Sequence, residues 1–169
     1  VVPWSFQGSA YGYCAGGYHN TAPAYEVDVI DKFSFTSNAN ATDVGNLTVG
    51  RHGCDGCGTE TYGYALNGTN DNGTRFNEID RFAYASDGNA TDVGDTTVAR
   101  DSYNGMSSAT HGYAAGGHNG SSYGDVIDKF LFGSSANSTD VGNLTTGTAH
   151  SMGVSSLTHG YNAGGWATN

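Results

Sequence analysis

The three cysteines of this chain are its residues best suited to redox or metal chemistry. Two of them lie in Cys54-Asp-Gly-Cys57, the spacing of a dithiol redox motif, and the third is Cys14. No βαβ pattern surrounds the motif, and no second pair of ligands completes a zinc site. In the sequence repeat of this chain, Met106 and Val154 take the place of Cys57, which indicates an apolar strand position. We therefore expect core thiols, or a structural disulfide from Cys14 to Cys54 or Cys57 in an oxidising compartment.

The six histidines follow no spacing that would place three of them on one metal ion. His111 and His159 stand where the equivalent repeats have Tyr11 and Tyr62, so an aromatic or hydrogen-bonding role accounts for both. The chain contains no recognisable catalytic constellation. The sequence therefore predicts no catalytic residue, no metal site and no cofactor, and we expect a protein that is not an enzyme.

The sequence Asp-Val-Gly occurs three times, beginning at Asp43, Asp92 and Asp140. Carboxylate and backbone oxygens suit calcium, but one carboxylate in each copy is too few for a calcium site without help from neighbours. Asp close to Gly is also the ordinary composition of a tight turn. We expect turns at these three places.

Asn-x-Ser/Thr sequons are unusually frequent. As candidate glycosylation sites we take those that fall in the repeated pattern: Asn40, Asn46, Asn89, Asn137 and Asn143. Such a density suits a glycosylated extracellular protein. The alternative is that an Asn-, Ser- and Thr-rich repeat generates sequons by chance and copies them at each duplication.

The charge of the chain argues against nucleic acid as a partner. The formal net charge is −10, from 16 acidic and 6 basic residues, whereas a nucleic-acid surface needs clustered Lys and Arg. No run of about 18 apolar residues is present, so we expect no membrane span. The low charge content is typical of extracellular or virion β-proteins. Because the first residue is Val1 and not Met, we expect either a removed leader or a segment of a longer polypeptide.

Most of the basic residues recur at equivalent places of the repeat. These residues are Lys32, Arg81 and Lys129 in one place, and Arg51 and Arg100 in another. A ring of cations for an anionic ligand is one interpretation. Residues that repeat with the fold usually build the fold, so we favour salt bridges within each repeat, to acids such as Asp31, Asp80 and Asp128.

An internal repeat of about fifty residues organises the whole chain. Its first block is Tyr/His-Gly-Tyr with a following Gly-Gly, and its copies begin at residues 11, 62, 111 and 159. The second block is Ile-Asp-Lys/Arg-Phe, within residues 29–35, 78–84 and 126–132. Its alternating pattern is that of a strand. The third block covers residues 40–51, 89–100 and 137–148.

These blocks resemble the landmarks of a kelch repeat, which has a second strand ending in Gly-Gly, a third strand with an aromatic residue, and a return led by Arg. Gly16-Gly17 and its copies match the glycine pair, and Asn67 replaces the first glycine once. Asn is suited to that place because it tolerates a positive φ. The usual Trp of the fourth strand is absent, so the resemblance is to a divergent kelch-like family.

The resemblance implies an all-β fold of about three and a half four-stranded antiparallel β-propeller blades. The units of this single repeat domain, residues 1–169, are approximately 1–51, 52–100, 101–148 and a partial unit 149–169. Fourteen strands are expected, the first of them beginning at Val1. A β-solenoid is the alternative, although fifty residues is long for its coil.

An incomplete propeller leaves open edge strands, which pair with other chains. We therefore expect identical or related subunits, or more of the same polypeptide, at the open blade edges. Which of these closes the propeller is not decided by the sequence.

The repeats also resemble those of structural proteins in marine and cyanobacterial viruses. That resemblance implies a virion tail, fibre or decoration protein, located on the virion or outside cells, whose loops bind a host glycan or neighbouring subunits. The candidate binding residues in the variable loops are Tyr25, Asn70, His118 and Tyr123. The alternatives are a glycosylated extracellular filament or surface-layer protein of a cell, and a secreted propeller enzyme, the least favoured.

Overall fold

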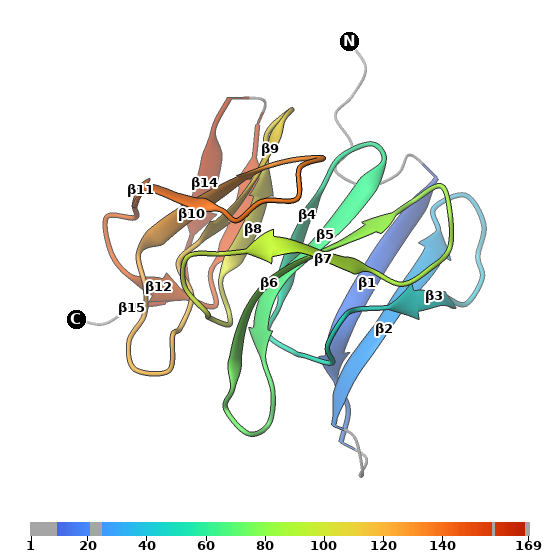
Figure 1. Ribbon diagram of the computed structural model, residues 1–169, viewed down its shortest axis with the longest axis horizontal. Coiled ribbons are helices and arrows are strands. Elements are labelled where there is room, and N and C mark those ends of the chain that lie inside the picture. Colours follow the sequence, from blue (N-terminus) through green and yellow to red (C-terminus); the bar gives the residue numbers. More distant parts are fainter. Residues whose placement is uncertain (1–9, 21–24, 157, 168–169) are drawn as a thin grey trace.

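The computed structural model describes residues 10–20, 25–156 and 158–167, and all regular structure in these ranges is β-strand. The prediction of an all-β chain is confirmed. The strand expected to begin at Val1 lies outside the described residues. Figure 1 shows the strands gathered into separate sheets that stand side by side.

Each sheet is antiparallel and contains strands from one repeat unit. Sheet 1 contains β1 (Tyr11–Tyr18), β2 (Glu26–Ser34) and β3 (Thr42–Asn46) in chain order. Sheet 2 contains β4 (Asp55–Gly58), β5 (Tyr62–Thr69), β6 (Arg75–Ala83) and β7 (Thr91–Asp95). Sheet 3 contains β8 (Asn104–Ser107), β9 (His111–Ala115), β10 (Val126–Leu131) and β11 (Thr139–Asn143). Sheet 4 is the pair β13 (Met152–Ser155) and β14 (Gly160–Ala163).

Two further strands of two residues, β12 (Thr148–Ala149) and β15 (Trp166–Ala167), pair with each other and were not predicted. In the described residues no ladder joins a named strand of one of these sheets to a named strand of the next. A solenoid would join them in that way, so its hydrogen-bonding pattern is not found there.

The first strands of successive sheets lie against one another, β4 against β8 and β8 against β13. Glycine makes this approach close. A Cβ atom on Gly105 would overlap the carbonyl group of Gly56, and one on Gly153 would lie 2.9 Å from the carbonyl oxygen of Gly105. The backbones of the three strands therefore meet where a larger residue would separate them.

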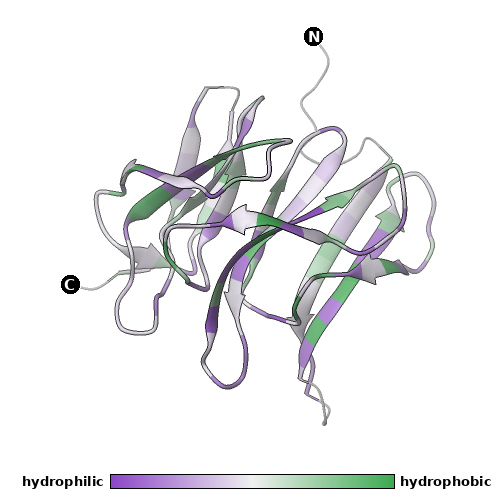
Figure 2. Cartoon of the chain, in the orientation of Figure 1, coloured by the Kyte–Doolittle hydropathy of each residue, from purple (hydrophilic) through white to green (hydrophobic). Residues whose placement is uncertain are grey.

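The hydrophobic core lies between the sheets. One cluster joins Ile30 and Leu47 of sheet 1 to Phe82 of sheet 2. A second cluster joins Tyr64 and Leu66 of sheet 2 to Phe130 of sheet 3, among others. Figure 2 shows hydrophobic positions alternating with hydrophilic ones along β2. The inner sheets are nevertheless buried on both faces, since each has a neighbour on either side.

In sheets 1 to 3 a phenylalanine of β2, β6 or β10 lies over a glycine of the strand before it, β1, β5 or β9. The cross-strand pairs are Gly12 with Phe33, Gly63 with Phe82, and Gly112 with Phe130. A Cβ atom on any of these glycines would overlap the facing ring. This contact explains why two residues recur in the repeat. The glycine of Tyr/His-Gly-Tyr leaves room for the ring, and the phenylalanine of Ile-Asp-Lys/Arg-Phe provides it.

The glycine pair at the end of β1, and its copies at the ends of β5, β9 and β14, have positive φ angles. Asn67, which replaces the first glycine in sheet 2, has φ of 47°, so the prediction that it tolerates this conformation is confirmed. Its side chain is buried and accepts a hydrogen bond from Thr96 Oγ1 at 2.9 Å. The second glycine donates its N–H to the returning chain, from Gly17 to Arg51 O and from Gly68 to Arg100 O.

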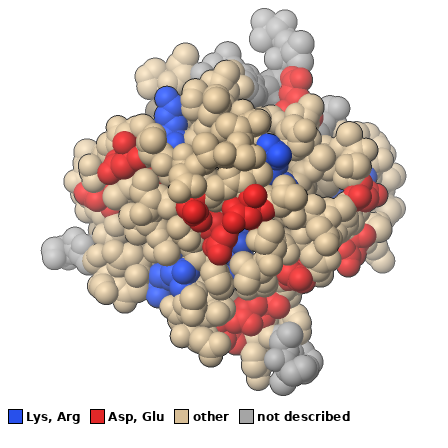
Figure 3. Space-filling view, in the orientation of Figure 1, with Lys and Arg blue, Asp and Glu red and all other residues tan. Residues whose placement is uncertain are grey.

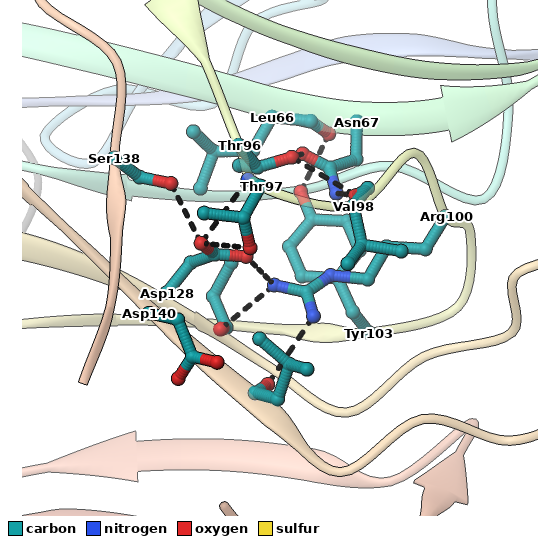
Figure 4. A network of polar contacts seen from close by, with 12 residues as sticks. Leu66, Asn67, Thr96, Thr97, Val98, Arg100, Tyr103, Asp128, Ser138 and Asp140 are labelled. Atoms are coloured by element: carbon teal, nitrogen blue, oxygen red, sulfur yellow. Dashed lines mark hydrogen bonds and ion pairs between the residues drawn. The ribbon is translucent and has the colours of Figure 1, made fainter. Parts of the chain in front are cut away.

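The two arginines that end the first and second repeat units each form an ion pair with an aspartate of the next sheet. Arg51 Nη2 lies 3.0 Å from Asp80 Oδ2, and Arg100 Nη2 lies 2.6 Å from Asp128 Oδ2, with all four side chains buried. Thr97 donates both its N–H and its hydroxyl to Asp128, as Figure 4 shows. The salt bridges expected within each repeat therefore run between successive repeats instead.

Replacing Arg100 by Met should destabilise the fold by about 3–5 kcal/mol, because it leaves Asp128 buried without its counter-charge. Urea unfolding followed by circular dichroism measures this free energy. Lys32→Met is the matched control, since Lys32 pairs with the exposed Asp87 at 3.0 Å and should cost less than about 1 kcal/mol. Equal losses from the two variants would show that burial does not make the Arg100 pair special.

Candidate binding face

The residue after the glycine pair occupies one place in all four units. It is Tyr18, Thr69, His118 or Trp166. Strands β1, β5 and β9 all end at the lower end of the molecule in Figure 1. The loop face is our name for the surface formed here by the four residues after the glycine pairs and by the described residues that connect each of these strands to the next. The positive φ of the glycines turns the chain there, so the repeat itself directs these side chains to one end.

Tyr18 is the centre of an aromatic group on the loop face. Its ring stacks on that of Tyr25 with centroids 6.0 Å apart, and it meets the ring of His52 edge-on at 5.3 Å. Tyr18 is 51% exposed. The structure thus places the predicted Tyr25 beside a more exposed tyrosine that sequence reasoning missed. Its place directly after Gly16-Gly17 was the signal that could have found it.

His118 and Tyr123 lie together, as their common loop suggested, with ring centroids 5.4 Å apart. Arg75 comes from sheet 2 and contacts both the Asp101 carboxylate at 2.8 Å and His118 Nδ1 at 2.9 Å. An arginine can only donate, so His118 Nδ1 is the acceptor of this hydrogen bond. Arg75, the basic residue outside the repeat pattern, therefore ties the loops of two sheets together.

Asn70 has a structural contact that its sequence position did not predict. Its side-chain oxygen accepts the N–H of Thr74 at 2.9 Å, and its carbonyl accepts the N–H of Gly73. These bonds close the turn between β5 and β6. The Asn70 side-chain oxygen therefore holds its own loop in shape.

Trp166 is the most exposed aromatic residue of the loop face, at 64%. Its ring lies 4.8 Å from that of His150, measured between centroids. The sequence analysis did not select it. A flat apolar ring of this size in contact with solvent is a common element of binding surfaces.

The three Asp-Val-Gly segments lie within strands β3, β7 and β11, so the turns expected there are not formed. In each one the aspartate accepts the N–H of the glycine two residues later, at 2.9–3.1 Å. Gly45 and Gly94 also lie directly against the backbone of the next unit. In the described residues no group of three or more His, Cys, Asp or Glu side chains is arranged to hold a metal ion.

Two of the candidate sequon asparagines have bonds between units. Asn89 Oδ1 accepts the N–H of Asn46 at 3.0 Å, and Asn137 Oδ1 accepts the N–H of Asp95 at 3.1 Å. This bond gives a structural reason for the recurrence of Asn at that place. Asn40 and Asn143 are exposed and Asn46 is half-buried. Whether any of the five carries a glycan stays a prediction.

Cys14, Cys54 and Cys57 are all free thiols in the structure. Burial raises the pKa of Cys54 and, far more strongly, that of Cys57. Both are therefore poor thiolate nucleophiles at neutral pH. The predicted disulfide is not formed in this structure, and pairing under oxidising conditions stays a prediction.

The charge on the surface is predominantly negative. Figure 3 shows acidic side chains gathered near the centre of one face, with basic side chains fewer and apart. No helix in the described part of the chain could cross a membrane.

No family model matches this chain, and no curated protein matches it. Among solved structures the chain is similar to one described as "Structure of YjhT", with a TM-score of 0.72 and 9% sequence identity. The alignment covers 86% of this chain and 53% of that one, so this chain spans about half its length. At this identity the likeness concerns the fold alone.

Iodoacetamide should modify Cys14 first and Cys57 last in the native protein at neutral pH. Each unit by which burial raises a thiol pKa lowers the thiolate fraction about tenfold, so we expect Cys57 to react at least tenfold more slowly than Cys14. Peptide mapping by mass spectrometry over time measures the order. In urea the three rates should converge, whereas fast native modification of Cys57 would contradict its burial.

Proposed function

We propose that this chain is a non-enzymatic adhesion module, built of kelch-like propeller blades, that binds a carbohydrate on its loop face. The likeness to blades is supported by the four-stranded sheets whose first strands meet, by the glycine pairs, and by the Arg-led return. Blades joined by buried ion pairs form a rigid support. Loops on such a support can vary in sequence while the fold stays the same.

The observation that carries this proposal is the stacked pair of Tyr18 and Tyr25 on the loop face, with a second exposed aromatic residue, Trp166, at the same place of another unit. Tyr18, Tyr25 and Trp166 each combine a flat apolar ring with a polar group, and such rings are suited to contact the apolar faces of sugars while hydrogen-bonding their hydroxyls. His118 adds an imidazole whose Nδ1 is already bonded to Arg75. The predominantly acidic surface favours a neutral or cationic glycan over a polyanion.

The resemblance of the repeats to those of viral structural proteins makes a virion tail, fibre or decoration protein the setting that we favour. In that setting the glycan belongs to the surface of a host cell. The alternative setting is a glycosylated extracellular filament or surface-layer protein, which is favoured by the exposure of Asn40 and Asn143. Mass spectrometry of the native protein distinguishes the two settings, since hexose-bearing peptides at these asparagines support the second.

Tyr18→Ala should abolish or weaken glycan binding at least tenfold, because it removes the central ring of the aromatic group. The probe is an array of purified surface polysaccharides from cyanobacteria and other marine bacteria, followed by titration calorimetry with any sugar that binds. Tyr11→Ala is the matched control. Tyr11 and Tyr18 begin and end the same strand and are similarly exposed, at 43% and 51%, but only Tyr18 lies on the loop face.

The control variant should bind like the wild type. If no polysaccharide on the array binds, or if both tyrosine variants lose binding equally, the loop face is not a carbohydrate site.

A further inference from the structure

We propose that the sugar bound on the loop face carries a free, positively charged amino group, which is recognised by Glu26 beside the stacked rings of Tyr18 and Tyr25. The inference rests on the proposed carbohydrate function and names the chemical class of its ligand. Three observations carry it: the position of Glu26, the absence of a counter-charge on it, and the negative surroundings of Tyr18.

Glu26 lies directly opposite Tyr18 in the ladder between β1 and β2. Side chains opposite one another in an antiparallel pair have Cβ atoms about 4.5–5.5 Å apart, so the carboxylate lies within reach of the tyrosine ring. Tyr25, the residue before Glu26, stacks on that same ring. One carboxylate and two phenol rings therefore border a single place on the loop face.

The repeat does not require an acid at this place. The residue paired with the one after the glycine pair is Glu26 in sheet 1, Arg75 in sheet 2 and Tyr123 in sheet 3. Residues that build a repeat recur from unit to unit, whereas residues that bind vary on a common support. The change from acid to base to aromatic residue therefore indicates that this place serves binding.

Glu26 has a hydrogen bond but no counter-charge. Its Oε1 accepts the N–H of Asp71 from the loop between β5 and β6. That bond lowers the pKa of Glu26, so the carboxylate is ionised at neutral pH. The salt bridges in the described part of the chain all use other acids. The carboxylate is thus available to a cationic group of a ligand.

The surroundings of Tyr18 are negatively charged. Desolvation is the main cause that raises the pKa of the Tyr18 hydroxyl, and the nearby charges of Asp71 and Glu26 raise it further. Asp71 is itself exposed. A cation close to an aromatic face is attracted by the ring as well as by neighbouring carboxylates. A neutral hydroxyl group at the same place has no such charge attraction.

The same contacts restrict the kind of cation. A carboxylate accepts hydrogen bonds and donates none, so a protonated amine can bond to Glu26, whereas a quaternary ammonium group has no N–H to donate. An N-acetyl group can donate but carries no charge. The exposed ring of Tyr18 suits the apolar face of the sugar that bears the amine. The ligand class is therefore an amino sugar without the acetyl group, such as glucosamine.

The test compares tetrasaccharides that have the same β-1,4-linked backbone and differ only at C2 of each sugar. The chitosan tetrasaccharide has an amino group there, the chitin tetrasaccharide an acetamido group and cellotetraose a hydroxyl group. Titration calorimetry is run at about pH 6.5, where a glutamate is ionised and the amino group of glucosamine is protonated. We expect the chitosan tetrasaccharide to bind at least about tenfold more tightly than the other two.

Glu26→Gln should weaken binding of the chitosan tetrasaccharide at least about fivefold and leave binding of cellotetraose unchanged. The glutamine keeps an oxygen for the N–H of Asp71 but has no charge. Glu60→Gln is the matched control, because it removes the same charge from an exposed residue between β4 and β5, at the opposite end of β5 from the loop face. It should bind all three sugars like the wild type.

Equal binding of the three tetrasaccharides, or equal loss in the two glutamate variants, would overturn the recognition of an amine and leave carbohydrate binding standing. Binding of neutral polysaccharides on the array without binding of the chitosan tetrasaccharide would have the same meaning. If no sugar binds at all, the proposed function fails and the inference fails with it.

Discussion

The arrangement of the sheets depends on an arginine that contacts two successive sheets, one through its backbone carbonyl and the other through its guanidinium. The carbonyl of Arg100 accepts the N–H of Gly68 in sheet 2, while its guanidinium pairs with the buried Asp128 of sheet 3. Arg51 does the same one unit earlier. Separating a buried pair leaves a charge without its counter-charge, which is costly, so each pair favours one position of a sheet relative to the one before it.

The sequence predicted most features within a repeat unit, but it did not predict which residues of neighbouring units contact each other. The strand pattern and the positive φ of Asn67 each follow from local chemistry, and the structure agrees with them. The turns expected at Asp-Val-Gly were wrong, because these residues pair with the preceding strand as β3, β7 and β11. The partner of Arg100 does not follow from spacing, because the acid of the same unit and the acid of the next are equivalent in sequence. Only the stacking of the sheets distinguishes the two acids.

The binding face was harder to predict for a related reason. Asn70 looks like a free loop residue in the sequence, yet its side chain closes its own turn. Tyr18 and Trp166 were missed because the place directly after the glycine pair holds a different residue type in each unit, so the repeat does not mark it. Asn89 and Asn137 satisfy the sequon pattern, but both bridge two units through hydrogen bonds. In each case the role depends on the neighbouring unit, which a single repeat does not reveal.

Repetition also constrains the two end sheets. Every unit carries the same apolar faces, because each was built to lie between two others. Phe82 and Phe130 are 8% and 5% exposed in the inner sheets, whereas their equivalent Phe33 in sheet 1 is 39% exposed. Met152, Val154 and Tyr161 of sheet 4 are exposed as well. The apolar pattern of the repeat is thus the same in every unit, and a neighbouring sheet is what buries it in sheets 2 and 3.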